Sequence, residues 1–164
     1  KSKISMNTLF GDMAERLAAF NPEEEALLSA KRNRLKIIRL NRDDQMFEQG
    51  IDARGDKIGR GYYKKPTQDY KEAVGQRYDH ITLRDTQAFH KSMDVRFSKT
   101  EFEITADDRK ESDLPGGADV FLTDIYGEDI LGLTKENLSF LKEEHIQPDM
   151  TRKLRDQLLG AKTK

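Results

Sequence analysis

The most constraining feature of this sequence is a change in the spacing of its apolar residues near the middle of the chain. Two short runs alternate apolar with polar residues, and their apolar members are Met93, Val95 and Phe97, then Phe102, Ile104 and Ala106. Successive side chains of a β-strand point to opposite faces. Lys99 and Thr100 lie between the runs and suit a turn. The pattern therefore predicts an antiparallel hairpin with one dry and one wet face.

A long helix is predicted from about residue 22 to residue 49. Asn21 suits the N-cap, Pro22 suits the first helical position, and Gly50 suits the stop. Apolar residues mark two sides of this helix: Leu27, Leu28, Leu35, Ile38 and Met46 share one, and Ile37, Leu40 and Phe47 lie on another. A helix that is apolar on two sides suggests burial against both its own domain and a neighbouring subunit.

The remaining segments complete an α+β pattern. Residues 50–80 read as an irregular glycine-rich segment with a helical turn from Thr67 to Ala73, and Asp85 or Thr86 can cap a short helix before the hairpin. A helix is predicted to begin at Thr134 and to be broken at Pro148, and a last helix to run from about Asp149 to Leu159. We expect a small antiparallel hairpin packed by the long N-terminal helix and by C-terminal helices, with extended arms. The predicted division is an arm at 1–21, an α+β body at 22–146, and a C-terminal helix and tail at 147–164.

Composition limits how much of this chain can be buried. Apolar residues make up 35% and charged residues 36% of the 164 residues, a low apolar share for a compact globule. Part of the stability is therefore expected to come from assembly with partners. The formal net charge of −1 excludes a whole-protein basic field that would gather nucleic acid. The chain has no cysteine, which excludes disulfides and thiolate metal sites, and no apolar run is long enough to cross a membrane.

The sequence predicts no catalytic, metal or cofactor site. Asp79, His80, Asp85 and His90 cluster in the chain, and a nuclease or hydrolase could use such groups. However, no known metal-ligand spacing occurs, and capping or surface roles account for these residues. The glycines of the GDKIGRG segment lack the lysine–hydroxyl pair of a phosphate-binding loop.

Candidate contact residues fall into three groups. Apolar residues at helical spacing in the N-terminal arm, two tyrosines of the glycine-rich segment, and the second apolar side of the long helix are predicted to lie at subunit interfaces: Leu9, Phe10, Met13, Leu17, Phe20, Tyr62, Tyr63, Ile37, Leu40 and Phe47. Basic residues of the long helix could instead face DNA phosphates, namely Arg34, Arg39 and Arg42. A solvated or salt-bridged face is the favoured interpretation of these arginines.

The run from Phe47 to Thr134 resembles bacteriophage tail-completion and virion-morphogenesis proteins, a family of head–tail neck components, as found in tailed phages of gut Bacteroidetes. The segments that carry this resemblance are GIDARGDKIGRGYY, ITLRDTQAFHKSMDVRF, EFEITAD and DIYGEDILGLT. Gln87 stands where that family usually has glycine.

The resemblance implies a structural virion protein, assembled in the host cytoplasm, that forms part of the neck, head–tail connector or tail-completion ring. It further implies a homo-oligomeric ring, contacts with portal, neck or tail subunits, and non-specific DNA contact in the lumen if the basic face points inward. No enzyme activity is implied. The alternative is a DNA-binding or nuclease-like DNA-processing protein of the same phage.

Overall fold

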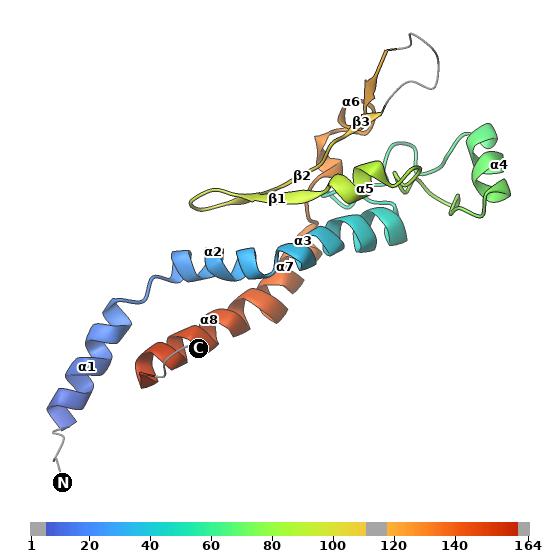
Figure 1. The fold of residues 1–164 in the computed structure, drawn as a ribbon. Helices are drawn as coiled ribbons and strands as arrows, with labels where there is room; N and C mark the ends of the chain where they lie inside the picture. Colours follow the sequence, from blue (N-terminus) through green and yellow to red (C-terminus); the bar gives the residue numbers. More distant parts are fainter. Residues whose placement is uncertain (1–5, 111–117, 161–164) are drawn as a thin grey trace.

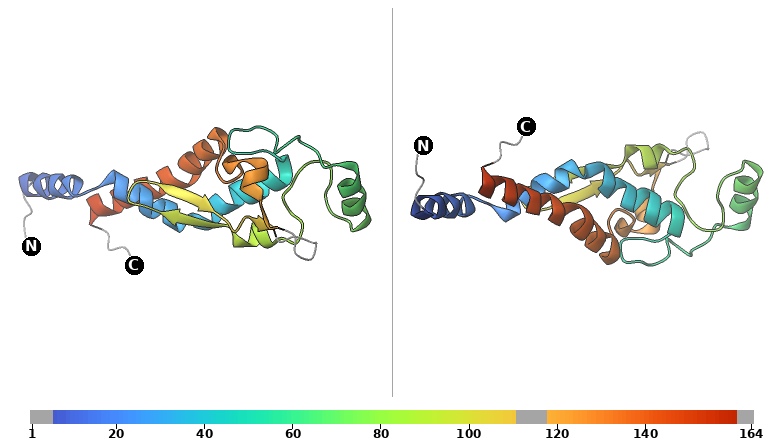
Figure 2. Two further views of the ribbon diagram at one scale, coloured as in Figure 1. Left: turned by 90° about the horizontal axis from the view of Figure 1, so that it is seen from above. Right: turned by 90° about the horizontal axis from the view of Figure 1, so that it is seen from below.

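A computed structural model of the chain describes residues 6–110 and 118–160, with side chains from Phe10 onward. The molecule is elongated and is built from two helical rods, a β-hairpin laid across them, and projecting elements at both ends (Figures 1 and 2). Two separate antiparallel two-stranded sheets accompany the helices. The predicted α+β fold class is confirmed.

The first helical rod departs from the single helix predicted over residues 22–49. It consists of α2 (Pro22–Arg32), α3 (Arg34–Arg39) and the π-helix η1 (Leu40–Gln49). The predicted ends are confirmed, because the Asn21 side chain accepts hydrogen bonds from two backbone N–H groups of the first turn and Gly50 adopts a left-handed φ of 64°. The rod is interrupted at Asn33, whose φ of −92° and ψ of 15° leave the α-helical region.

The second helical rod lies alongside α2 and contains α7 (Lys135–Leu141), the π-turn η3 (Lys142–Ile146) and α8 (Gln147–Leu159). Thr134 caps α7 as predicted, through a hydrogen bond from Asn137 N. The predicted break at Pro148 is wrong, because helical structure continues through it. Pro148 is the second residue of α8, directly after the π-turn, where the hydrogen-bond register changes and the missing N–H costs little. Asp149 ties the rods together by accepting hydrogen bonds from Ser29 and Arg32.

The hairpin forms as predicted from β1 (Asp94–Phe97) and β2 (Phe102–Thr105). Asp94 faces Thr105 and Phe97 faces Phe102 across the ladder, and α3 lies beside β1. The dry face covers the middle of the first rod. The core gathers there, between the hairpin, α3, η1 and the segment that precedes α7, and its buried apolar members are Ala30, Ile37, Ile38, Leu40, Met46, Ile58, Ile81, Phe89, Met93, Val95, Ile104, Ile130, Leu133 and Leu141.

Short elements complete the fold. Two of them follow the first rod: α4 (Lys65–Ala73), which confirms the expected helical turn, and α5 (Ala88–Ser92). Gln87 precedes α5 with a φ of 68°, so it takes the left-handed conformation that glycine adopts most easily. The last group is β3 (Arg109–Lys110), β4 (Val120–Phe121), α6 (Leu122–Tyr126) and the 3₁₀ turn η2 (Glu128–Ile130).

The arm helix α1 (Met6–Ala18) is attached to the rest of the molecule at one end only. Arg16 Nη1 donates to Leu158 O at 3.3 Å, and Gln157 Nε2 donates to Arg16 O at 2.8 Å. None of the described side chains from Phe10 to Asn21 belongs to the buried core. The other end of α1 projects away from the two rods (Figure 1), so the N-terminal arm is an appendage of the body.

Candidate interaction groove

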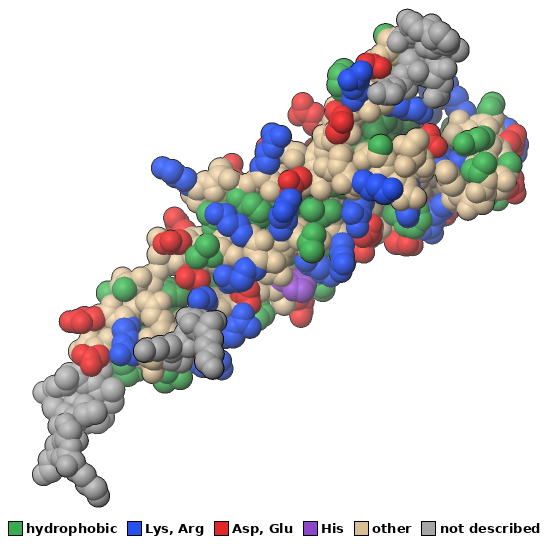
Figure 3. Space-filling view, in the orientation of Figure 1, with side chains coloured by type: hydrophobic (Ala, Val, Ile, Leu, Met, Phe, Trp, Pro, Cys, Tyr) green, Lys and Arg blue, Asp and Glu red, His purple; other side chains and the backbone are tan. Residues whose placement is uncertain are grey.

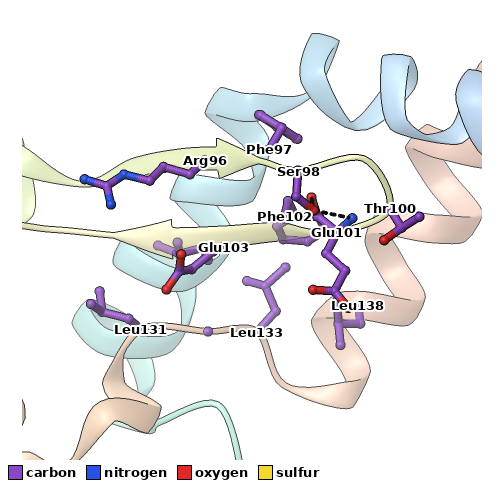
Figure 4. A pocket seen from close by; sticks show the side chains of 12 residues that line it. Arg96, Phe97, Ser98, Thr100, Glu101, Phe102, Glu103, Leu131, Leu133 and Leu138 are labelled. Atoms are coloured by element: carbon purple, nitrogen blue, oxygen red, sulfur yellow. Dashed lines mark hydrogen bonds between the residues drawn. The ribbon is translucent and has the colours of Figure 1, made fainter.

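A groove runs along the free side of the hairpin, between β2 and the irregular segment Leu131–Leu133 (Figure 4). Its volume is about 750 Å³. The hairpin supplies one wall, and the stretch between η2 and the start of α7 supplies the other. The lining residues are Arg96, Phe97, Ser98, Thr100, Glu101, Phe102, Glu103, Ile104, Leu131, Gly132, Leu133 and Leu138.

The β2 wall presents an open strand edge. Ser98 N donates to Glu101 O at 2.9 Å, which makes these two residues a hydrogen-bonded pair of the antiparallel ladder. Bonded and non-bonded pairs alternate along such a ladder, so Arg96 and Glu103 form the next bonded pair. The peptide groups of Phe102 and Ile104 therefore point away from β1, toward the groove. Within the described ranges no backbone hydrogen bond joins them to another residue.

The opposite edge of the hairpin, on β1, is covered. Helix α3 lies beside β1, and Arg34 of that helix forms an ion pair with Asp94. The same carboxylate accepts a hydrogen bond from Val95 N. Hydrogen bonding by Arg34 lowers the pKa of Asp94 below its ordinary value. The Asp94–Val95 end of the β1 edge is therefore occupied by these contacts.

Two buried amides on the π-helix η1 hold the second wall. Asn41 Nδ2 donates to Ile130 O at 3.1 Å and to Gly132 O at 2.7 Å. Gln45 Nε2 also donates to Gly132 O, at 3.0 Å, and Gln45 Oε1 accepts from Thr134 N at 2.9 Å. The Thr134 N–H points to Gln45 on η1, and the Leu133 carbonyl lies trans to it in the same planar peptide group, so this carbonyl turns away from η1.

The side chains of the groove divide into an apolar and a charged set. Ile104 and Leu133 are buried at its base, while Leu138 is 43% exposed. Phe97 and Phe102 pack with ring centroids 6.3 Å apart. Glu101 and Glu103 are exposed on the wet face of β2, and Arg96 lies opposite Glu103. An extended backbone with apolar side chains on one face and basic side chains on the other would satisfy both sets.

The structure corrects part of the predicted interface. Ile37 is 0% and Leu40 2% exposed, so both belong to the molecule's own core and cannot contact a neighbour. Their burial follows from the hairpin, which covers the side of the rod assigned to a partner. Tyr63 is half-buried against the core, and its hydroxyl accepts from Thr82 N at 2.9 Å. Phe47 is half-buried between the guanidinium groups of Arg77 and Arg84.

Other predicted interface residues lie on the surface. Phe10 and Leu17 of α1 are 59% and 53% exposed, and Tyr62 is also exposed. Met13 and Phe20 are half-buried. The side chain of Leu9 lies outside the described part of the chain. These positions are accessible to a partner, and their interface role stays a prediction.

The three arginines predicted to face DNA do not form one uncompensated patch. Arg34 pairs with Asp94, and Arg42 pairs with Asp43 through two hydrogen bonds of 2.8 and 2.9 Å. Arg39 is exposed. Basic and acidic side chains are interspersed over the face seen in Figure 3. This arrangement fits the favoured salt-bridged interpretation, and DNA contact stays a prediction.

The acid and histidine cluster of the sequence does not converge on one site, although His80 Nδ1 lies 3.2 Å from Asp79 Oδ1. His80 Nε2 lies 2.9 Å from Phe47 O at the end of η1, and His90 Nε2 lies 2.9 Å from Thr82 O. Burial lowers the pKa of His90 to about 4. Asp85 does not cap α5; Thr86 Oγ1 accepts from Ala88 N instead. No group of three or more histidine, cysteine or acidic side chains in the described ranges is placed to hold a metal ion.

Sequence reasoning missed the residues that build the groove's second wall. Asn41 and Gln45 are both 0% exposed. Asn41 and Gln45 follow Ile37 at four-residue steps and therefore lie on the same side of the helix as this buried isoleucine. Two amide side chains on an otherwise apolar side of the helix could have indicated buried hydrogen-bonding groups. Leu131 and Leu133 were recognised only as part of an apolar block.

The described helices include none with the length and apolar character needed to span a membrane. No protein-family model, curated protein or solved structure matches the chain.

Proposed function

We propose that this chain is a structural subunit of a tailed-bacteriophage virion, and that its copies assemble into a ring at the neck or head–tail connector. The observation that carries the proposal is the distribution of apolar side chains. The core occupies only the middle of an elongated molecule, whereas elements that project from it expose large apolar residues.

These exposed residues lie at both ends of the molecule. At one end, α1 exposes Phe10 and Leu17. At the other, α4 and its flank expose Tyr70 and Val74, and β4 exposes Val120 and Phe121 by 42% and 44%. Patches of this kind mark interaction sites. Contacts between unlike ends of identical subunits are heterologous, and they close into a ring when the rotation between neighbours is suitable.

The resemblance to virion-morphogenesis proteins supports the same proposal from the sequence side. Two of its segments, EFEITAD and DIYGEDILGLT, contribute to the two walls of the groove. The resemblance and the groove thus point to the same part of the chain as a contact region.

The mass of the purified chain in solution, followed over a wide concentration range, tests the assembly. We expect concentration-dependent oligomers that weaken when Phe10 and Leu17 are both replaced by serine. Leu35→Ser removes a comparably exposed leucine, 68% exposed, from the middle of the molecule, and should leave assembly unchanged.

Electron microscopy of phage particles with a tagged chain tests the location and should place the tag between head and tail. A chain that stays monomeric at every concentration and is absent from particles would overturn the proposal. Metal-dependent DNA cleavage would favour the DNA-processing alternative.

A further inference from the structure

We infer that residues 1–5 of one copy bind as an added β-strand in the groove of a neighbouring copy, along the open edge of β2. This inference rests on the proposed function in one respect, since the occupant is a second copy of the chain. It goes further by naming the two segments that meet and the chemistry that selects them.

The groove is suited to an extended backbone. The peptide groups of Phe102 and Ile104 face it from β2, and the carbonyl of Leu133 is turned away from η1 on the other wall. Strand addition to an exposed sheet edge uses main-chain hydrogen bonds for affinity and alternate side-chain pockets for specificity. A helix would leave these backbone groups unpaired, because its own peptide groups are already bonded internally.

Two copies of β2 cannot pair well with each other. In a two-fold antiparallel pairing, Phe102 and Ile104 of one copy must form hydrogen-bonded pairs with the outward-facing residues of the other copy. Three registers allow this. These place Glu103 opposite the partner's Glu103, Glu103 opposite the partner's Glu101, or Glu101 opposite the partner's Asp107. Like charges directly opposite each other destabilise an antiparallel pair. The acidic residues of β2 therefore act against symmetric pairing and favour a basic strand.

Residues 1–5, Lys-Ser-Lys-Ile-Ser, have the matching pattern. In an antiparallel strand with Ile4 opposite Phe102, Lys3 stands opposite Glu103. Lys1 then lies on the same wet face as Lys3. Ile4 and the small Ser2 lie on the dry face, opposite Phe102 and Ile104. The two lysines and Ile4 thus fit the edge in charge and in position.

The arm cannot reach the groove of its own chain while α1 stays in place. Five extended residues span at most about 17 Å. Helix α1, with its 13 residues, is about 20 Å long, and it is attached to α8 near Arg16 with its first turn at the outer end (Figure 1). To reach the groove of their own chain, residues 1–5 would have to run back along the whole of α1 and continue to β2. The residues 1–5 that bind in the groove therefore belong to a neighbouring copy.

Charge reversal tests the pairing in the full-length chain. Glu103→Lys in the groove and Lys3→Glu in the arm should each weaken self-association about tenfold. The double variant, and an equimolar mixture of the two single variants, should associate within about twofold of the unmodified chain. Glu144→Lys makes the same charge change on the surface of η3 and should have no effect. Single variants that associate normally, or a double variant that is not rescued, would overturn the inference.

A labelled peptide of residues 1–6 separates this inference from the proposed function. Its binding to the Lys3→Glu chain, whose own arm is weakened, should be saturable and should fall about tenfold when Glu103→Lys is added. If the unmodified chain assembles but the peptide does not bind, the arm–groove contact is wrong and the ring proposal stands. If the peptide binds but no assembly occurs at any concentration, the contact stands and the ring is wrong.

Discussion

At the scale of single residues, the clearest pH-dependent group is His90, a buried histidine with a lowered pKa. Its side chain is 5% exposed, and its Nε2 lies 2.9 Å from the carbonyl oxygen of Thr82. A carbonyl only accepts hydrogen bonds, so Nε2 carries the proton of the neutral ring. Burial lowers the pKa of His90 from 6.5 to about 4; the Thr82 carbonyl and Asp43 oppose this, while Arg84 and Arg42 add to it. The folded protein therefore holds this histidine neutral at physiological pH.

We predict that acid destabilises the fold through His90. Its pKa is depressed in the folded state, so the unfolded chain takes up the proton first as the pH falls. The free energy of unfolding should be unaffected by His90 above about pH 6.5, should fall between about pH 6.5 and pH 4, and should level off below, with a total loss of about 3 kcal/mol. Denaturant titrations across this range measure it.

The matched variant is His90→Gln, which retains a hydrogen-bond donor but does not titrate. The difference in unfolding free energy between this variant and the unmodified chain should shrink as the pH falls through the same window. A difference that stays constant from pH 7 to pH 4 would contradict the predicted role of His90.

At the scale of elements, sequence periodicity predicted the parts whose local pattern decides their structure. The alternation from Met93 to Ala106 predicted the hairpin, because only a strand places every second residue on one face. Asn21, Thr134 and Gly50 marked helix ends, because their side chain or backbone freedom satisfies terminal peptide groups. The groove's first wall was therefore predictable.

The second wall was not predictable because tertiary contacts decide it. In the first rod, the shift from α-helical to π-helical geometry after Arg39 changes which side chains face the core. No local sequence pattern predicts this shift. Leu40 is the first residue after that shift, and Ile37 is buried by the hairpin, a tertiary contact that helical periodicity does not reveal. Residue-type reasoning also treated Pro148 as a terminator, although the π-turn before it accommodates the ring.

Gln45 should be the residue that this second wall tolerates losing least. We predict that Gln45→Leu lowers the free energy of unfolding by roughly 2–4 kcal/mol, because it leaves the buried Thr134 N and the Asn137 amide without the acceptor that they share. Gln49→Leu changes an exposed glutamine at the end of the same π-helix and should cost less than about 0.5 kcal/mol. Urea denaturation of the three proteins checks both values. Equal losses in the two variants would contradict the role of Gln45 in holding the second wall of the groove.

At the scale of the whole molecule, the core and the arm are energetically separable. Every member of the buried cluster lies between Ala30 and Ile146, counting the half-buried residues packed against it. The arm contributes the contact of α1 with α8, in which exposed polar groups make the hydrogen bonds. Folding of the body should therefore need little from residues 1–20, whereas assembly should need much of them.

The arm deletion that tests this separation should stop at Phe20. Asn21 Oδ1 accepts from Glu23 N at 3.1 Å and from Glu24 N at 3.3 Å, so removing it as well would cost about 1 kcal/mol of helix stability. We predict that a chain lacking residues 1–20 unfolds cooperatively within a few degrees of the full chain but no longer self-associates. Calorimetry and light scattering on the same samples measure the two properties, and the chain lacking residues 1–21 serves as the matched comparison, less stable but equally unable to assemble. A shortened chain that assembles like the full one would show that the arm is dispensable and that subunit contacts lie elsewhere on the body.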